Sequence, residues 1–327
     1  MSLQSRRKVE SSSEPHNYTL HVYKQGIQLP TMDIHCMMIL SYIHLLPKNY
    51  QQYIDVKFEN TYMSVVLVDN NTGKYYRGLS TIMNILRTQL YDIDASQNED
   101  QVETPNTKQI NTEFINTLIE DQLLPCLYHY WFDYDDNYSI IYDAYVGPLT
   151  LVDGLRLYFV RKSYRKESQS KLKQKTDEQV FELLQYALQL ISNTLGTNDF
   201  ILGTSKPTLL DSKLFAVLAC IYYPDFVSRY YRDLFKHYPN IISYVHNMAG
   251  KYFTFYVNEE IFKEPSALSS QSFDAICETI RRIRVKKERQ YWDTLYFLGG
   301  SAALLFGYLF ATRRMQSMVK KSTPQDQ

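Results

Sequence analysis

An uncharged run near the C-terminus, TLYFLGGSAALLFGYLFA at residues 294–311, most limits how this chain folds. As a helix it would extend about 27 Å, close to the thickness of a bilayer's hydrocarbon core. Trp292 and Tyr296 lie near one end and Arg313 and Arg314 follow the other, as residues at the two membrane interfaces do. The run therefore predicts a transmembrane anchor. A buried core helix is the alternative, and charges at both ends disfavour it.

The flanks of this run predict where the anchor inserts. The preceding segment RRIRVKKERQ, residues 281–290, is basic and suits an anionic membrane surface. Only residues 312–327 follow the run, which is typical of a tail-anchored protein with its bulk in the cytosol. Moderate hydrophobicity with basic flanks favours the mitochondrial outer membrane over the endoplasmic reticulum.

Small residues recur along one side of the predicted anchor, at Gly299, Ala303, Gly307 and Ala311. A face of this kind lets two membrane helices approach closely. Glycine and alanine are also common in membrane spans for no such reason, so packing and mere composition both remain open.

Charge and cysteine usage exclude some classes of function. Lys+Arg and Asp+Glu both number 35, so the chain has no basic excess with which a general nucleic-acid binder would neutralise phosphates. Its cysteines, at positions 36, 126, 220 and 277, are far apart and form no C-x-x-C pair. We expect buried, reduced thiols in a reducing compartment.

The N-terminal part alternates strand and helix patterns. Ser80 is expected to open the last helix of this part. The expected order is β-α-β-β-β-α, which is that of a thioredoxin-like domain: a strand at 17–24, a helix at 32–46, a strand at 53–60, a hairpin at 63–78 and a helix at 79–89.

After a polar linker the pattern becomes helical. Pro125 should kink the first of these helices. The charged segment 163–175 is expected to be a solvated connector. The predicted helices span residues 112–134, 137–146, 176–195, 208–223, 225–236 and 238–250.

Taken together, the patterns predict an α+β chain with a thioredoxin-like domain, an all-α domain and one C-terminal transmembrane helix. Its expected parts are a disordered tail at 1–16, the thioredoxin-like domain at 17–91, a linker at 92–111, the helical domain at 112–272, a basic juxtamembrane helix at 273–293, the anchor at 294–312 and a short tail at 313–327.

A carboxylate lies within an apolar run at KPTLLDSKLFAVLA, residues 206–219. Thr208 and Asp211 have the spacing of a capping box, in which each side chain accepts a hydrogen bond from the other residue's backbone N–H. Pro207 precedes the cap, where the chain is not yet helical. This pattern favours a structural role for Asp211 over a catalytic one.

Other motifs leave little room for familiar chemistry. The sequence has no H-E-x-x-H, no P-loop and no dinucleotide fingerprint. Asp133, Asp135 and Asp136 cluster without the spacing of a calcium loop. We therefore predict no metal and no cofactor. The tyrosine-rich stretch 128–145 has two interpretations, helix packing or a protein-interaction surface.

Four stretches resemble the metaxins, a branch of the glutathione-transferase superfamily. They are QGIQLPTMDIHCMMILSYIHL at 25–45, IEDQLLPCLYHYWFDYDDNY at 119–138, KPTLLDSKLFAVLACI at 206–221 and YPNIISYVHNMAGKYF at 238–253.

This resemblance implies a glutathione-transferase-like fold and a non-enzymatic role. Metaxins are subunits of the mitochondrial outer-membrane sorting and assembly machinery, which inserts β-barrel proteins. The implied partners are the barrel-forming core subunit, a second metaxin-like subunit and β-barrel precursors.

The chain departs from active transferases at the residues that hold glutathione. Their cis-proline before the third strand is replaced by Val65 after Ser64, and metaxins too commonly keep that proline. We expect a trans bond at Val65. The acid-serine pair after the hairpin reads Leu79-Ser80, without the acid, and Tyr23 at the end of the first strand fits packing better than thiol activation.

Two alternatives remain. One is a tail-anchored transferase-like protein of mitochondrial fission, similar to the ganglioside-induced differentiation-associated family, whose long helical insertion the short connector 163–175 disfavours. The other is an active membrane-bound glutathione transferase.

Overall fold

A computed structural model describes residues 17–59, 65–95, 105–146, 151–173, 175–226, 228–258 and 261–263. The chain divides into two units, residues 1–269 and 270–327, and every described residue belongs to the first. The predicted juxtamembrane helix and anchor therefore lie outside the described residues. Among the described helices, none is long and apolar enough to cross a membrane.

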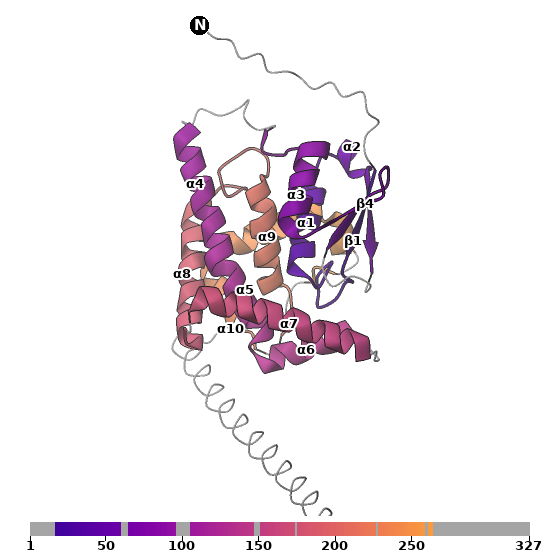
Figure 1. Cartoon of the computed structure of the whole chain (residues 1–327). Helices are drawn as coiled ribbons and strands as arrows, with labels where there is room; N and C mark the ends of the chain where they lie inside the picture. The colour runs from indigo at the N-terminus through magenta and orange to yellow at the C-terminus, as the bar shows by residue number, and fades with distance from the viewer. Residues whose placement is uncertain are drawn as a thin grey trace, which may run out of the picture. The chain divides into compact units, whose positions relative to one another are not determined.

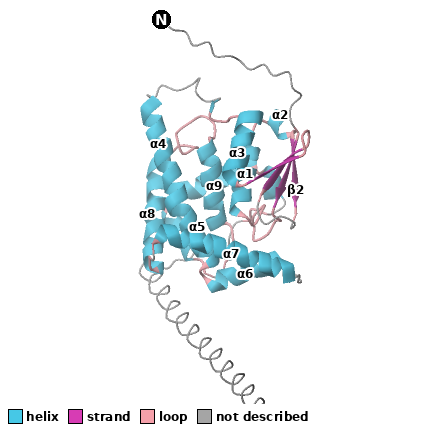
Figure 2. Cartoon of the chain, in the orientation of Figure 1, coloured by secondary structure: helices cyan, strands magenta, loops and turns pink. Residues whose placement is uncertain are grey.

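A mixed four-stranded sheet forms one side of the unit, in the order β2-β1-β3-β4 (Figures 1 and 2). Strand β1 (Tyr18–Val22) pairs in parallel with β2 (Ile54–Phe58) and antiparallel with β3 (Val66–Asp69). Strand β3 continues through a turn into β4 (Lys74–Arg77), and Gly73 in that turn has a φ of 70°. The predicted strands and hairpin are confirmed.

Helices α1 (Ile34–Leu45) and α3 (Leu79–Ile85) lie between the sheet and α9 (Leu209–Tyr222) (Figure 1). Helix α1 is buried on almost every side, because it packs against both the sheet and the helical part. The short α2 (Lys48–Gln51) precedes β2.

The prediction that Ser80 opens the helix beginning at Leu79 is wrong, because the Ser80 side chain does not cap this helix. Its N-cap is Gly78, with a φ of 85° and no side-chain cap bond. After Ile85 the helix widens into a π turn, Leu86–Leu90. This turn places Arg87 beside the segment that follows, where the cavity described below lies.

The helical part begins earlier than predicted, because α4 starts at Pro105 within the expected linker. Its other helices are α5 (Leu124–Phe132), α6 (Asp135–Val146), α7 (Leu151–Leu172), α8 (Asp177–Leu195), α10 (Tyr230–Asp233), α11 (Pro239–Tyr252) and α12 (Thr254–Asn258), with a 3-10 turn at Leu234–His237.

Pro125 alters the helix in which it lies without ending it. Helix α4 (Pro105–Leu118) runs into a π turn, Ile119–Leu123, and α5 follows with Pro125 in its first turn. A proline has no N–H to donate to the preceding turn, and a π turn is one way in which a helix accommodates such a break. The structure thus has a π turn directly before Leu124 and Pro125, and the kink expected at Pro125 stays a prediction.

The prediction of a solvated connector at 163–175 is wrong, because residues up to Leu172 belong to the 22-residue helix α7. Tyr164, Ser168 and Leu172 are buried and recur every fourth residue, so they form one inward face. The Ser168 hydroxyl donates to the Pro125 carbonyl oxygen over 3.0 Å, which ties α7 to α5.

Most tyrosines of the stretch 128–145 are buried between helices, which favours the helix-packing interpretation for them. Tyr128, Tyr130, Tyr134 and Tyr145 are buried, and only Tyr142 is exposed. The cysteines at 36, 126 and 220 are buried and free, as predicted, and Cys277 lies outside the described residues.

Candidate functional site

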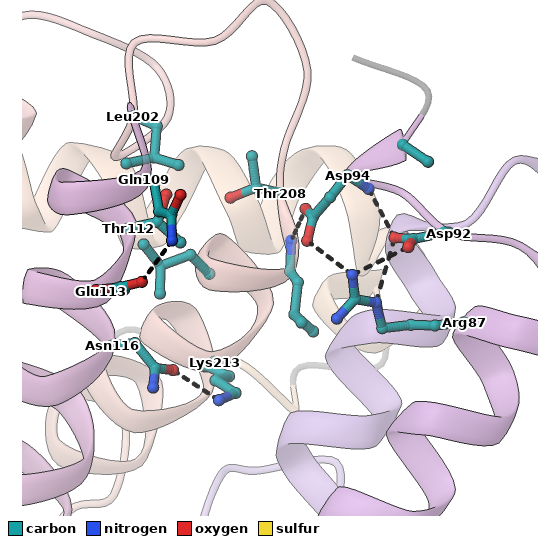
Figure 3. Close-up of a pocket in the computed structure, with 13 residues that line it drawn as sticks. Arg87, Asp92, Asp94, Gln109, Thr112, Glu113, Asn116, Leu202, Thr208 and Lys213 are labelled. Atoms are coloured by element: carbon teal, nitrogen blue, oxygen red, sulfur yellow. Dashed lines mark hydrogen bonds and ion pairs between the residues drawn. The ribbon is translucent and has the colours of Figure 1, made fainter. Parts of the chain in front are cut away.

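A cavity of about 610 Å³ opens where the end of the thioredoxin-like part meets α4 and the start of α9 (Figure 3). Its walls come from segments far apart in the sequence. The described residues that line it are Arg87, Asp92, Asp94, Ala95, Gln109, Thr112, Glu113, Asn116, Leu202, Thr208, Leu209, Leu210 and Lys213.

Arg87 organises one wall of this cavity. Its Nε and Nη2 donate to the two carboxylate oxygens of Asp92 over 3.2 and 3.0 Å, and Nη2 lies 3.5 Å from Asp94 Oδ2. The hydrogen bond to Asp92 raises the pKa of the Arg87 guanidinium. The guanidinium thus fixes two carboxylates in the segment that follows the π turn.

Asp94 also joins this wall to the helical part. Its Oδ1 accepts a hydrogen bond from the backbone N–H of Leu209, the first residue of α9, over 3.0 Å. A carboxylate here satisfies an N–H that has no partner within the helix and complements the helix dipole.

The opposite wall carries its own charge pairs (Figure 3). Lys213 Nζ donates to Asn116 Oδ1 over 2.7 Å and to Glu120 Oε1 over 2.9 Å. Gln109 Nε2 donates to Glu113 Oε1 over 2.9 Å. The described lining includes no cysteine, histidine or tyrosine. The cavity is lined mostly by polar side chains, and Leu202, Leu209 and Leu210 add apolar surface.

A second candidate region is the corner between the end of β1 and the start of α1, where Tyr23 lies. Asp33 caps α1, and its Oδ1 accepts from the Cys36 N–H over 2.7 Å. Its Oδ2 accepts from the Tyr164 hydroxyl over 2.8 Å. Both oxygens of this buried carboxylate are therefore engaged.

A second tyrosine from the helical part fills the same corner. The Tyr145 hydroxyl donates to the Met32 carbonyl oxygen over 2.6 Å. The Tyr145 ring stacks on that of Tyr23, with 4.5 Å between centroids. The Tyr145 side chain of α6 thus lies against Tyr23, and this contact agrees with a packing role for Tyr23.

Burial favours the protonated forms of the Cys36 thiol and of the Tyr145 and Tyr164 phenols. It raises the pKa of the Cys36 thiol well above its usual value, and the nearby Asp33 charge acts in the same direction. Burial likewise raises the pKa values of Tyr145 and Tyr164. A reactive thiol or phenol needs a lowered pKa, so the environment works against nucleophilic use of these three side chains.

The structure places the other residues of the transferase comparison as follows. Val65 is buried before β3 and Leu79 begins α3, whereas Ser80 is exposed in its first turn. Among the described residues no peptide bond is cis. Ser64 lies outside them, so the trans bond expected before Val65 stays a prediction.

The capping box at the start of α9 is present and larger than its sequence pattern implies. Thr208 Oγ1 accepts from the Asp211 N–H over 3.3 Å, and Asp211 Oδ2 accepts from the Thr208 N–H over 2.8 Å. Asp211 Oδ1 also accepts from the Ile201 N–H over 2.9 Å and from the Tyr244 hydroxyl over 3.1 Å. Burial raises the pKa of Asp211, while these hydrogen bonds act in the opposite direction.

Sequence reasoning identified Thr208 and Asp211 but missed the two interdomain pairings, Asp33 with Tyr164 and Asp94 with Leu209. Asp33 carried a signal as the residue near a helix start, whereas its partner belongs to the segment wrongly expected to be a loop. The small-residue face at Gly299, Ala303, Gly307 and Ala311 lies outside the described residues. Within the described part, no group of three His, Cys, Asp or Glu side chains is placed to hold a metal ion.

Comparisons with known proteins agree with this architecture. The sequence family described as the glutathione S-transferase C-terminal domain matches residues 184–248. No curated protein sequence matches the chain.

The solved structures to which the chain is similar include three enzymes of low sequence identity. A glutathione S-transferase from Actinobacillus pleuropneumoniae has 12% identity and a TM-score of 0.38, over 79% of this chain and 99% of its own. A β-etherase from Sphingobium has 10% sequence identity and a TM-score of 0.45, and the match covers 74% of this chain and 99% of the β-etherase. A rice glutathione transferase solved with glutathione has 10% sequence identity and a TM-score of 0.40, and the match covers 83% of this chain and 99% of the rice protein.

Residues 184–248 therefore resemble a glutathione S-transferase C-terminal domain, and a thioredoxin-like sheet lies ahead of them in the chain. This part of the resemblance in the sequence is confirmed.

Proposed function

We propose that the protein is a non-enzymatic, metaxin-like subunit of the mitochondrial outer-membrane sorting and assembly machinery. In this role it would assist the import and insertion of β-barrel proteins. Its partners would be the barrel-forming core subunit, a second metaxin-like subunit and β-barrel precursors.

One observation carries the non-enzymatic part of the proposal. Tyr145 stacks on Tyr23 and donates its hydroxyl to Met32, and the Tyr164 hydroxyl donates to Asp33 in the same corner. These tyrosines hold the two domains together where a transferase of this fold would handle a thiol. This supports use of the fold as a binding module.

The sequence supports the location. The uncharged run at 294–311 and its basic flanks are typical of a membrane anchor in the outer membrane. Carbonate extraction and protease treatment of intact mitochondria test this location. We expect the protein to resist extraction and residues 1–290 to be digested, and protection of that large part would contradict the proposed orientation.

Affinity purification of the full chain from detergent-solubilised mitochondria tests the assembly role. We expect the barrel-forming core subunit to co-purify in comparable amount. The matched control is an unrelated tail-anchored protein with the same tag. Absence of the core subunit, with an intact bait, would contradict the proposal.

A mitochondrial fission role is the second candidate. One observation weakens the argument from the sequence against it. The fission-related family has a long helical insertion, and a short connector at 163–175 disfavoured it. In the structure, residues up to Leu172 instead belong to the 22-residue helix α7. Co-purification of fission factors in place of the core subunit would support this second role.

A further inference from the structure

Helix α7 presents large apolar side chains to solvent over its first three turns. Leu155, Tyr158 and Phe159 are 61%, 56% and 55% exposed, and the Tyr158 and Phe159 rings meet edge to face with 5.6 Å between centroids. Side chains of this kind are normally buried, and a group of them on one helix marks an interaction site.

Two lysines continue the same face. Leu155, Phe159, Lys162 and Lys166 are spaced by four, three and four residues, so they lie on one side of the helix. We name Leu155, Tyr158, Phe159, Lys162 and Lys166 the outward face of α7.

The opposite side of α7 fixes the direction of this face. Leu157, Tyr164, Ser168 and Leu172 are buried, and the helix packs on α5 and α6. The Tyr164 hydroxyl is bound to the Asp33 carboxylate. The outward face is therefore held away from the core, and the helix has no second way to bury it.

The lysines of the outward face are free to meet an external anion. Arg161 and Arg165 of the same helix pair with Asp135 and Asp133 at 3.1 and 2.7 Å, and Lys171 pairs with Asp121. Within the described part of the chain, Lys162 and Lys166 are exposed and form no ion pair.

The size of the patch favours a lipid surface over a folded partner. Three half-exposed side chains offer on the order of 350 Å² of surface, whereas a stable protein interface takes about 800 Å² from each partner. A bilayer interface accepts a small group of aromatic and aliphatic side chains, and lysines beside them gain from anionic headgroups.

We propose that the outward face of α7 rests on an anionic lipid surface, with Leu155, Tyr158 and Phe159 in the interface and Lys162 and Lys166 against the headgroups. The inference rests on the proposed membrane location but not on the assembly role. It gives the soluble part a second membrane contact besides the predicted anchor, and so restricts its orientation over the bilayer.

The test uses the full chain, reconstituted into phosphatidylcholine vesicles with or without phosphatidylserine. A Cys277→Ser background leaves only buried cysteines in the described part. Phe159→Cys then carries a fluorophore, and lipids bearing a nitroxide quench it by contact. Tyr186→Cys, an equally exposed position on α8, is the matched control.

We expect quenching at position 159 to exceed that at 186 several-fold in vesicles with phosphatidylserine, and to fall with added salt. Lys162→Ala with Lys166→Ala should bring it close to the control. Equal quenching at both positions in protein that floats with the vesicles would overturn the proposal and leave the assembly role untouched.

Two other outcomes would also overturn the proposal. Failure of the chain to float with the vesicles would remove the membrane location on which the inference rests. A probe at 159 that is shielded only when solubilised assembly machinery is added would assign the face to a protein partner.

Discussion

The Tyr164 hydroxyl, in the middle of α7, donates to Asp33 Oδ2, at the N-cap of α1, over 2.8 Å. The two residues are 131 positions apart, and both are buried. Asp33 also caps α1, so one carboxylate holds the start of a thioredoxin-like helix and its contact with the helical domain. The interface between the domains is polar at this point.

Replacement Tyr164→Phe should destabilise the protein, because it leaves a buried carboxylate oxygen without its donor. We expect the free energy of unfolding to fall by about 1–3 kcal/mol. Thermal or urea unfolding of the purified protein measures this loss. Tyr158→Phe, on the exposed side of the same helix, should change stability by less than about 0.5 kcal/mol. Equal effects of the two variants would contradict the role of the Asp33 contact.

Asp211 should behave as a folding residue. Loss of an ordinary cap costs about 0.5–2 kcal/mol. Here Asp211→Ala leaves the buried Ile201 and Thr208 N–H groups without their side-chain acceptor, whereas the Tyr244 hydroxyl keeps the backbone carbonyl oxygen of residue 211, so we expect about 3 kcal/mol.

The conservative variant Asp211→Asn should recover part of this loss, because its amide oxygen still accepts hydrogen bonds. Function in cells should fall only as far as the amount of folded protein does. A variant that unfolds like the parent but has no function would instead make Asp211 a site residue.

The protein should lose stability on mild acidification through His44. Burial lowers the pKa of this imidazole to about 4. In the unfolded chain the group takes up a proton near pH 6.5, so its contribution is complete above that pH and is lost as pH falls toward 4. Between pH 7 and pH 5 we expect a loss on the order of 1–2 kcal/mol from this residue.

Denaturant titrations at several pH values measure this dependence. His44→Leu keeps an apolar contact with Phe253 and Tyr256 and should flatten the acid side of the stability curve. The exposed His237, changed to Leu in the same way, should leave the parent curve unchanged. A curve that keeps its slope in His44→Leu would show that another group titrates.

Features set by nearby residues were predictable from the sequence, and those set by distant ones were not. The Thr208–Asp211 box spans four residues, so its geometry follows from the local pattern. The order of strands and helices along the first part of the chain follows from local periodicity in the same way. The Asp94–Leu209 bond joins residues 115 positions apart, and no local pattern specifies it.

The error at α7 has a specific cause. Its inward residues Tyr164, Ser168 and Leu172 have helical spacing, but only Leu172 is aliphatic and charged residues surround all three. The segment is helical because two hydroxyl groups find buried partners, the Asp33 carboxylate and the Pro125 carbonyl. Tertiary hydrogen bonds therefore replace the apolar stripe from which a helix is usually recognised.

Glutathione should not bind measurably. The expectation rests on Val65 in place of proline, on Leu79 in place of an acid, and on the Tyr145 ring that stacks on Tyr23. Titration calorimetry of the purified full chain against glutathione should give no heat beyond dilution. An active transferase run in parallel is the positive control, and a micromolar dissociation constant would revive the enzyme alternative.

The small-residue face of the predicted anchor gives the last prediction. If it packs on another membrane helix or a barrel wall, Gly299→Leu with Gly307→Leu should separate the two backbones and remove close contacts. The double variant should stay in the outer membrane but co-purify less with the assembly machinery. β-Barrel precursors should then mature more slowly, while import into the matrix stays near normal. The matched control is Leu298→Ile with Leu305→Ile, on the other side of the span. Equal co-purification of parent, variant and control would reduce the anchor to a tether, and partner binding would then belong to the cytosolic domains.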